Sequence, residues 1–347
     1  MVKEELSAVT EPLLSWYSAH QRDLPWRRDK EPYHVWVSEI MLQQTRVEAV
    51  RQKYIDFMQV LPSVKALAAC GDDLLMKLWE GLGYYSRARN LKRAAQVIME
   101  EHGGAFPREY DAVRALPGIG DYTAGAICSI CYGMPTPAVD GNVIRVMARF
   151  LCLEEDLTEQ SKKRELSALL REIYPAGRCG EMTQALMELG ATVCVPKGEP
   201  GCEACPLMER CRSRSGAWKR LPVRPEKKAR KQENRTVLLL SCDGRIAVEK
   251  RPAAGLLAGL WQFPNVSGKL TETEAWQLAE KLGCRPQRLL SSLQRQHVFT
   301  HIQWDMTGYR IECGEMPENF RWAMADEVER EISLPTAFRQ FLDTELL

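Results

Sequence analysis

The spacing of apolar residues changes near residue 234, and this change divides the chain into two parts of different fold class. Up to residue 193 the apolar side chains recur at helical spacing, without convincing alternation. Beyond residue 234 they alternate, and residues 236–240 and 245–248 predict two strands joined by a hairpin turn at Cys242–Gly244. We therefore predict an all-α domain followed by an α+β domain, each large enough to bury a core.

The domain boundaries are predicted from the same change. Residues 1–218 form the helical domain, residues 219–234 a basic linker, and residues 235–347 the α+β domain. From Lys219 to Arg235 the chain has eight Lys or Arg residues and two Glu residues. Such a segment is either a solvated tether or a tether that lies along DNA.

Individual elements follow from the spacing within each domain. Helices are expected over residues 4–20, 33–51, 122–131, 143–151, 182–193 and 273–282. Two further strands are expected over residues 297–302 and 305–311. Cys128 and Cys131 lie in a helix of small apolar residues, which predicts core packing.

Charge and cysteine content limit the classes of function. The chain of 347 residues has a net charge of +1, so any surface that binds nucleic acid is a local one. No apolar run is long enough to cross a bilayer, and we expect no membrane partner. The 12 Cys residues, without a secretory signal, indicate a reducing compartment, where clustered Cys bind metals more often than they form disulfides.

The segment from Leu116 to Val146 combines a Gly-rich turn with a single carboxylate. Gly118 and Gly120 precede a predicted helix, whose free N–H groups can hold a DNA phosphate. Asp140 stands directly before the next helix. It is either an ordinary N-cap or an acid with a chemical role.

A second acid, Glu39, lies among apolar neighbours in the predicted helix 33–51. It is either a solvated surface residue or an acid whose pKa is raised by an apolar pocket, which suits a general acid. Gln44 follows it and can read a base edge or fill a gap in a base stack. Trp26 beside Arg27 fits base stacking and a phosphate contact, or a loop anchored to the core.

Two more stretches contain candidate ligands. Residues 81–90 hold Gly, Tyr and Arg residues that fit a loop wedged into a duplex, or a helix break with buried Tyr. Four Cys residues follow the spacing C-x7-C-x2-C-x5-C, which predicts one metal site: Cys194, Cys202, Cys205 and Cys211. Zinc is the general expectation for four thiolates, and an iron–sulfur cluster is the alternative.

The Leu-Pro-Gly-Ile-Gly turn, the two acids and the four Cys, in this order, resemble the adenine DNA glycosylases of the MutY family. These enzymes belong to the helix-hairpin-helix base excision superfamily, and the resemblance extends over essentially the full chain. It implies a helix-hairpin-helix at about residues 112–131 and one [4Fe–4S] cluster in the loop 194–211. The family spacing is C-x6-C-x2-C-x5-C, so this chain has one extra residue before Cys202. Residues 255–264, GLLAGLWQFP, resemble the Nudix-like C-terminal domain of these enzymes.

The resemblance also implies a function. The enzyme would be a monofunctional glycosylase that flips adenine out of duplex DNA and hydrolyses it when it is paired with 8-oxoguanine or guanine. It would be a monomer of the bacterial cytosol, associated with the nucleoid. By the match, Glu39 protonates adenine and Asp140 stabilises or captures the sugar cation, supported by Tyr122 and Asn142. The adenine pocket is Trp26, Arg27, Leu42 and Gln184, and the DNA-binding residues are Gln44, Tyr84, Arg87, Gly118, Gly120, Phe299, Thr300 and His301.

Three departures from related patterns bear on function. An endonuclease III-type lyase needs an amine after the hairpin glycines, and Tyr122 stands where that subfamily has Lys. A non-catalytic lesion sensor or redox module is disfavoured because both acids are present. Residues 276–281 keep one acid of the Nudix metal-binding box, so we expect no phosphohydrolase activity. The family's Phe-Ser-His lesion loop has Thr at its central position here, Thr300.

Overall fold

The computed structural model describes residues 6–223, 225 and 229–342. The first residues of the predicted helix 4–20 and part of the predicted linker 219–234 therefore lie outside the described residues. The contacts define two compact units, one of residues 1–69 and 89–226 and one of residues 70–88 and 227–347. Within the described residues, no helix combines the length and the apolar character that a bilayer span requires.

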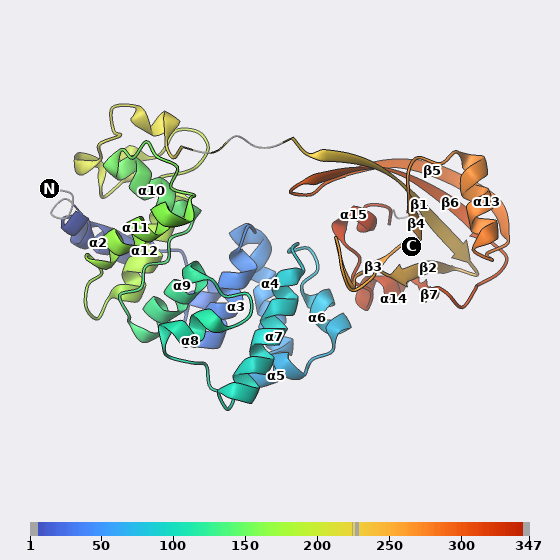
Figure 1. Cartoon of the computed structure of the whole chain (residues 1–347), viewed down its shortest axis with the longest axis horizontal. Helices are drawn as coiled ribbons and strands as arrows, with labels where there is room; N and C mark the ends of the chain where they lie inside the picture. The colour runs from blue at the N-terminus through green and yellow to red at the C-terminus, as the bar shows by residue number, and fades with distance from the viewer. Residues whose placement is uncertain (1–5, 224, 226–228, 343–347) are drawn as a thin grey trace. The chain divides into compact units, whose positions relative to one another are not determined.

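The first unit is helical, as predicted (Figure 1). Its α-helices are α2 (Thr10–His20), α3 (Pro32–Leu42), α4 (Val47–Val60), α5 (Val64–Ala69), α7 (Ser86–Glu101), α8 (Tyr110–Ala115), α9 (Asp121–Tyr132), α10 (Gly141–Leu151), α11 (Gln160–Arg171) and α12 (Cys179–Thr192). Short 3₁₀ turns are η1 (Pro25–Arg27), η2 (Cys202–Ala204), η3 (Met208–Arg210) and η4 (Ala217–Arg220). Helix α7 begins at the boundary between the units.

A single apolar core joins α2, α10, α11 and α12 (Figure 1). Leu13 of α2, Met147 of α10 and Leu186 of α12 are among its fully buried members. Helix α12 also approaches α10 closely, because a Cβ at Gly190 would lie 2.6 Å from the Cβ of Asn142. Glycine is therefore required there, and the close packing fixes the position of Asn142.

The predicted helix over residues 33–51 is wrong in one respect, because it is two helices. Helix α3 ends at Leu42 and α4 begins at Val47. Between them Gln44 has φ of 57°, a left-handed conformation that a continuous helix cannot contain. The break leaves the Gln44 side chain exposed at a turn.

The second unit is built on a seven-stranded sheet with helices, as the predicted α+β class requires. The strands are β1 (Lys231–Cys242), β2 (Arg245–Lys250), β3 (Trp261–Gln262), β4 (Asn265–Ser267), β5 (Pro286–Val298), β6 (Ile302–Cys313) and β7 (Arg321–Met324). The helices are α6 (Asp72–Leu78), α13 (Glu272–Lys281), α14 (Ala325–Arg330) and α15 (Thr336–Arg339). The predicted hairpin turn is confirmed, with Asp243 and Gly244 at positive φ between the antiparallel strands β1 and β2.

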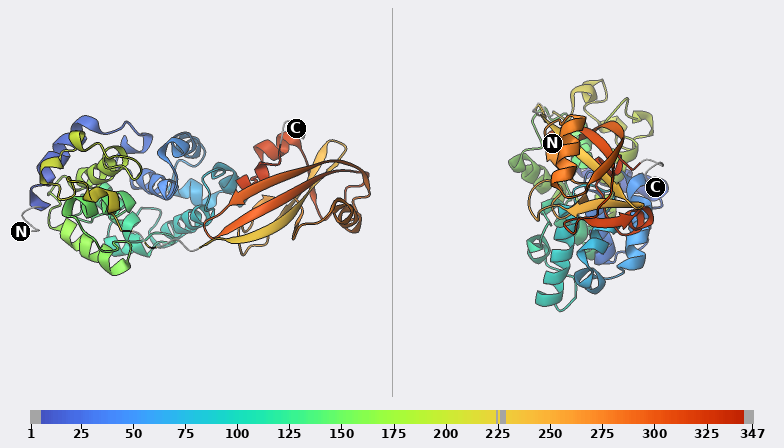
Figure 2. Two further views of the ribbon diagram at one scale, coloured as in Figure 1. Left: turned by 90° about the horizontal axis from the view of Figure 1, so that it is seen from above. Right: turned by 90° about the vertical axis from the view of Figure 1, so that its right-hand side faces the viewer.

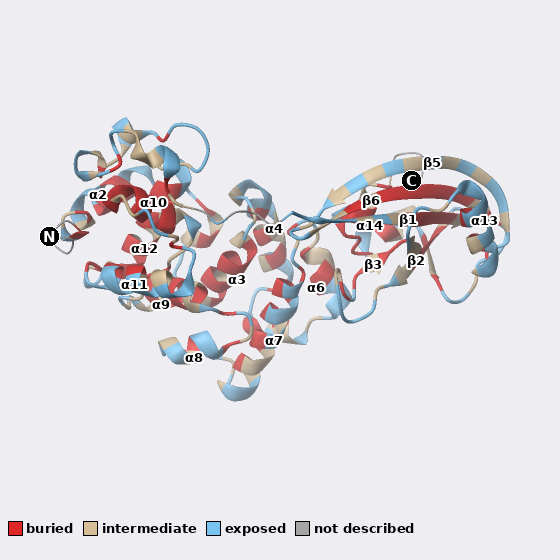
Figure 3. Cartoon of the chain, turned by 45° about the horizontal axis from the view of Figure 1, so that its top comes forward, coloured by how far each residue is buried: buried red, intermediate tan, exposed pale blue. Residues whose placement is uncertain are grey.

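The sheet runs in the order β3-β2-β1-β6-β5, with β4 paired to β1 and β7 to β2. Strand β1 pairs in parallel with β6 from Lys231↔Ile302 to Ser241↔Glu312, and these long strands run side by side in Figure 2. Alternate residues of β1 enter different cores: Val237 and Leu239 pack with α15, whereas Leu238 and Leu240 pack with α13. Figure 3 shows the contrast between the buried strands β1 and β6 and the more exposed edge strand β5.

The strand predicted over residues 297–302 is also wrong. Strand β5 ends at Val298 and β6 begins at Ile302, so residues 299–301 are the tip of a long antiparallel hairpin. The Phe299 amide donates a hydrogen bond of 2.8 Å to the Ile302 carbonyl, which closes the turn. Thr300 and His301 are exposed at this tip.

The segment of residues 70–88 packs with the C-terminal unit through charged side chains. Glu80 accepts a 3.1 Å hydrogen bond from the Leu334 amide and forms a 2.9 Å ion pair with Arg339. Asp73 pairs with Lys250 at 2.9 Å. The sequence pattern gives no sign of these contacts, because the partners are more than 170 residues apart.

Candidate active site

One cavity of the first unit, of about 200 Å³, contains every residue predicted to be catalytic or to bind adenine. Its lining includes Trp26, Arg27, Glu39, Leu42, Tyr122, Asp140, Asn142 and Gln184. These residues come from η1, α3, α9, α10 and α12 and the residue before α10, which are distant in sequence. The eight residues therefore meet at one place, although the structure does not test their roles.

Glu39 enters this cavity from the buried side of α3 and is 7% exposed. Burial raises the pKa of its carboxyl to about 7, although the Tyr122 hydroxyl favours the ionised form by donating a hydrogen bond of 2.5 Å to Oε2. The negative charge of Asp140 raises the pKa further. About half of the Glu39 carboxyls are therefore protonated near neutral pH, as general acid chemistry requires.

Asp140 lies at the N-terminus of α10 and is both N-cap and cavity residue. Its Oδ1 accepts a 2.8 Å hydrogen bond from the Val143 amide, and its Oδ2 accepts one of 2.7 Å from Asn142 Nδ2. Burial raises the pKa of Asp140, but both hydrogen bonds and the helix N-terminus favour its ionised form. The two acids thus have different environments, and only Asp140 has hydrogen bonds from the backbone.

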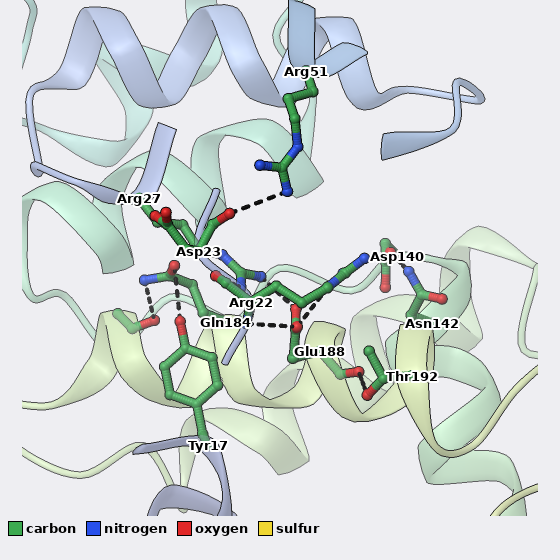
Figure 4. Close-up of polar contacts among 11 residues, drawn as sticks. Tyr17, Arg22, Asp23, Arg27, Arg51, Asp140, Asn142, Gln184, Glu188 and Thr192 are labelled. Atoms are coloured by element: carbon green, nitrogen blue, oxygen red, sulfur yellow. Dashed lines mark hydrogen bonds and ion pairs between the residues drawn. The ribbon is translucent and has the colours of Figure 1, made fainter. Parts of the chain in front are cut away.

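Glu188 is a cavity residue that the sequence did not suggest. Its side chain has no exposed surface and accepts hydrogen bonds from Arg22 Nε at 2.7 Å and Arg27 Nη2 at 2.7 Å. Figure 4 shows both guanidinium groups directed at it, beside Gln184 and Tyr17. Burial alone would raise the pKa of Glu188, but these hydrogen bonds hold it below its usual range.

The same cluster orients the predicted adenine pocket. Tyr17 donates a 3.1 Å hydrogen bond to Gln184 Oε1, and the Arg27 guanidinium lies 5.8 Å from the centre of the Tyr17 ring. Gln184 and Glu188 are four residues apart on α12, so they share one helix face. That spacing was the available sequence signal for Glu188 once Gln184 had been singled out.

The predicted DNA-binding residues of the first unit lie outside the cavity lining. Gln44 is exposed at the α3–α4 turn, and Gly118 and Gly120 are exposed at the turn before α9. Gly118 has φ of +79°, and a Cβ there would lie 2.7 Å from the Cβ of Asn90. Only glycine fits this turn, and its predicted contact with a DNA phosphate stays a prediction.

In the second unit, the predicted wedge residue Tyr84 and the predicted lesion-reading residue Thr300 are in contact. Their hydroxyl oxygens are 2.7 Å apart, and Tyr84 is 47% exposed. Arg87 makes contacts with its own loop, through hydrogen bonds of 2.7 Å to the Leu82 carbonyl and 3.1 Å to the Gly83 carbonyl. Its predicted DNA contact stays a prediction, and burial lowers its pKa to about 10.

The predicted metal ligands also converge. Cys194, Cys202, Cys205 and Cys211 line one small cavity together with Arg149 and Trp218. Arg149 Nη1 donates a hydrogen bond of 3.3 Å to Cys194 Sγ. Within the described ranges, the side chains do not form a group of three or more His, Cys, Asp or Glu placed to hold a single metal ion. The four thiols share the lining of one small cavity, and their role as ligands of an iron–sulfur cluster stays a prediction.

Arg145 links this loop to the catalytic cavity. It donates hydrogen bonds of 2.6 Å to the Cys194 carbonyl, 2.7 Å to the Gly190 carbonyl and 2.8 Å to Asn142 Oδ1. Asn142 in turn donates to Asp140. A buried cation therefore connects the first Cys of the loop with the carboxylate at the head of α10.

Comparison with known proteins agrees with this geometry. Residues 37–175 match the model of the HhH-GPD superfamily of base excision DNA repair proteins, and residues 235–344 match that of the NUDIX domain. The chain is 34% identical over 400 residues to the adenine DNA glycosylase of Homo sapiens, covering 93% of this chain and 71% of that protein. It is 32% identical over 403 residues to that of Schizosaccharomyces pombe, covering 94% and 87%.

Solved structures resemble the helical unit. A thermostable thymine-DNA glycosylase superposes with a TM-score of 0.56 at 27% identity, over 61% of this chain and 97% of that one. Endonuclease III in a non-covalent DNA complex superposes with a TM-score of 0.54, over 63% of this chain and 99% of that one, and at 20% identity it shows the fold alone.

A helix-hairpin-helix domain with two acids in one cavity defines a base excision repair glycosylase, an enzyme that hydrolyses an N-glycosidic bond. The extent and identity of the matches make the assignment more specific. The chain belongs to the adenine DNA glycosylase family.

Proposed function

We propose that this enzyme removes adenine paired with 8-oxoguanine or guanine in duplex DNA, without cleaving the strand. The observation that carries the proposal is the cavity in which Glu39 and Asp140 lie among six further predicted site residues. While adenine is stacked in the duplex it cannot reach the residues of this cavity. The nucleotide must therefore be flipped out of the duplex and into the cavity.

Two carboxyl groups in different hydrogen-bonding environments suit the chemistry. Adenine leaves poorly as an anion, so Glu39, protonated in part at neutral pH, donates a proton to the ring. Cleavage of the glycosidic bond leaves positive charge on the sugar. Asp140, held by the Val143 amide and by Asn142, which both favour its carboxylate form, stabilises that charge or captures the sugar before water completes hydrolysis.

The absence of strand cleavage is proposed from Tyr122, which stands after the hairpin glycines where endonuclease III-type lyases have Lys. Lys30 also lines the cavity, but it does not occupy that position. A lyase forms a Schiff base with the sugar and needs an amine nucleophile. Tyr122 occupies the position next to Glu39, and its hydroxyl is already a donor to Glu39. Burial, together with the charge of Glu39, raises the pKa of Tyr122 well above its usual value, so it stays a neutral hydrogen-bond donor.

The lesion strand is read, in this proposal, by the hairpin tip of the second unit. The Tyr84 ring is exposed for insertion into the stack, and its hydroxyl meets that of Thr300. The Phe299 ring packs edge-on against Trp304, with ring centres 4.8 Å apart, so the tip is held from beneath. Discrimination from one or two polar contacts at the lesion amounts to roughly 1–3 kcal/mol, or about tenfold to a hundredfold.

The lesion-reading role is tested by comparing excision rates on A:8-oxoguanine and A:G duplexes. Thr300→Ala should lose part of the preference for 8-oxoguanine, and Tyr84→Ala should lose more. His301→Ala removes the exposed side chain next to Thr300 and is compared with Thr300→Ala at the same hairpin tip. An unchanged preference in all three variants would assign lesion reading elsewhere. Point variants are preferable to truncation, because residues 70–88 pack with the C-terminal unit.

We further propose that Cys194, Cys202, Cys205 and Cys211 hold one [4Fe–4S] cluster. Its contribution would be structural, since it cross-links the loop that Arg145 and Arg149 connect to α10. Purified protein should contain about four irons per chain, as expected for one such cluster. One zinc and no iron per chain would contradict this assignment.

The proposed reaction is tested with duplexes that carry A opposite 8-oxoguanine, A opposite T, or thymine glycol. Adenine should be released from the first only, and the strand should break only after alkali. Strand cleavage without alkali, or release of thymine glycol, would favour the lyase alternative.

A further inference from the structure

A second cavity of the first unit, of about 570 Å³, shares Tyr122 with the catalytic one, and its charged lining residues are mostly cations. Its walls are α8, the start of α9 and one face of α11. We call it the α11 cleft, and its charged lining residues are Arg114, Asp121, Lys163, Arg164 and Arg171. Four cations and one acid give it a net charge of +3 by count, in a chain whose total charge is +1.

The cations of α11 are arranged along one helix face. Lys163 and Arg164 both lie three or four residues from Gln160 and from Ser167, and Arg171 lies four residues beyond Ser167, so these side chains share one helix face. All five residues line the cleft. The side chains of Lys163, Arg164 and Arg171 form no hydrogen bond and no ion pair within the part of the chain that the structure describes. They are therefore available for an anion from outside the protein.

The single acid of the cleft is already neutralised. Asp121 forms an ion pair with Arg114 and accepts a 3.0 Å hydrogen bond from Gln160 Nε2. It therefore opposes an incoming anion less than a free carboxylate would. Lys162, by contrast, is not among the cleft lining residues and pairs with Glu155 at 2.9 Å and Glu165 at 3.0 Å.

From these observations we infer that the α11 cleft binds the phosphates of the duplex that flanks the flipped nucleotide. Tyr122 lines both this cleft and the catalytic cavity, so a strand with one nucleotide in the cavity passes near the cleft. The face from Gln160 to Arg171 is roughly 16 Å long at 1.5 Å per residue. At about 3.4 Å of helix axis per phosphate, that length faces about five phosphates of one strand.

This surface contributes affinity without reading sequence or damage. Each phosphate contact releases condensed counterions, so the contribution appears in the salt dependence of binding. The inference rests on duplex DNA being the substrate, as proposed above, but not on which base pair is repaired. Its test therefore uses undamaged duplex, and its failure would leave the adenine assignment intact.

The experiment measures the dissociation constant for a 30-base-pair undamaged duplex between 50 and 300 mM KCl, for wild type and variants. The matched pair is Lys163→Gln and Lys162→Gln, adjacent residues of α11 that lose the same charge on different faces. The slope of log K against log salt is negative, and Lys163→Gln should make it shallower by about 0.9. Lys162→Gln should leave the slope unchanged, and equal effects of both would overturn the inference.

Two further variants test the cleft as a whole. A triple variant should make the salt slope shallower by roughly two to three and weaken binding more than about tenfold at 50 mM salt. It combines Lys163→Gln, Arg164→Gln and Arg171→Gln. Asp121→Asn should tighten binding, because it releases Arg114 and removes the one acid.

Binding of pyrophosphate distinguishes duplex from a small anion as the ligand. If the triple variant loses pyrophosphate binding but keeps the wild-type DNA slope, the cleft is a small-anion site and the inference is wrong. If the DNA slope falls as expected, the cleft is a duplex contact whether or not pyrophosphate also binds there.

Discussion

Replacing Tyr122 by Phe should move the pH dependence of adenine excision to higher pH. The Tyr122 hydroxyl donates to Glu39 and favours its ionised form, so its loss raises a pKa that is already about 7. A hydrogen bond to a charged group is worth about 1.5–3 kcal/mol. Because one pKa unit corresponds to about 1.4 kcal/mol, the pKa of Glu39 should rise by roughly one to two units.

The sign of the effect follows from the form that acts. Glu39 acts as an acid when protonated, so the excision rate falls as the pH rises through its pKa. In the wild type this fall should be centred near pH 7, and in Tyr122→Phe at roughly pH 8 to 9. The maximal rate of the variant can also fall. The pH at which the rate declines does not depend on that loss.

The assay is single-turnover release of adenine from an A:8-oxoguanine duplex between pH 5 and 10, with protein in excess. Tyr132→Phe is the matched control, because Tyr132 lies on the same helix and donates to the Pro107 carbonyl at 3.1 Å. The assignment of Glu39 as an acid hydrogen-bonded by Tyr122 would be refuted if the decline of the excision rate stays centred at pH 7 in Tyr122→Phe, or moves to lower pH.

Two predictions concern stability. Glu39 has a folded pKa raised from 4.5 to about 7, so the stability it contributes is complete below pH 4.5 and is lost as the pH rises through 7. At pH 4, Glu39→Gln should therefore have the same free energy of unfolding in urea as the wild type. At pH 9 the variant should be about 3 kcal/mol more stable than the wild type. A variant that matches the wild type at both pH values would contradict the burial argument. Glu188→Ala should lower the free energy of unfolding by about 3 kcal/mol, because it leaves Arg22 and Arg27 without their shared buried partner. The control Glu181→Ala removes a partly exposed ion pair with Arg178 and should lower it by less than about 1 kcal/mol.

The helical domain and the helix positions of its two cavity acids could be predicted because their signals are local. The Gly-rich turn before α9 and the carboxylate before α10 are each defined by a few adjacent residues. Asp140 illustrates how two interpretations coincide, since it is the N-cap of α10 and also a cavity residue. Spacing alone could not distinguish these roles, because an N-cap and a catalytic acid need the same position at a helix N-terminus.

What the sequence did not predict depends on distant partners or on backbone conformations with no sequence signal. Glu188 appears as one polar residue of an amphipathic helix, and its burial makes sense only beside Arg22 and Arg27, more than 160 residues earlier. The break at Gln44 was missed because glutamine is not a typical turn residue, although its φ is positive here. The hairpin tip at residues 299–301 was predicted as strand because Phe, Thr and Ile favour strands.

The measurement that tests the central claim most directly is adenine release by Glu39→Gln and Asp140→Asn under single-turnover conditions. Glutamine cannot donate the proton and asparagine cannot offset the charge of the sugar, so each rate should fall by at least about a hundredfold. Binding to a duplex with A opposite 8-oxoguanine should stay within a few fold of wild type. Rates within tenfold of wild type for either variant would contradict the division of labour between the two carboxyl groups.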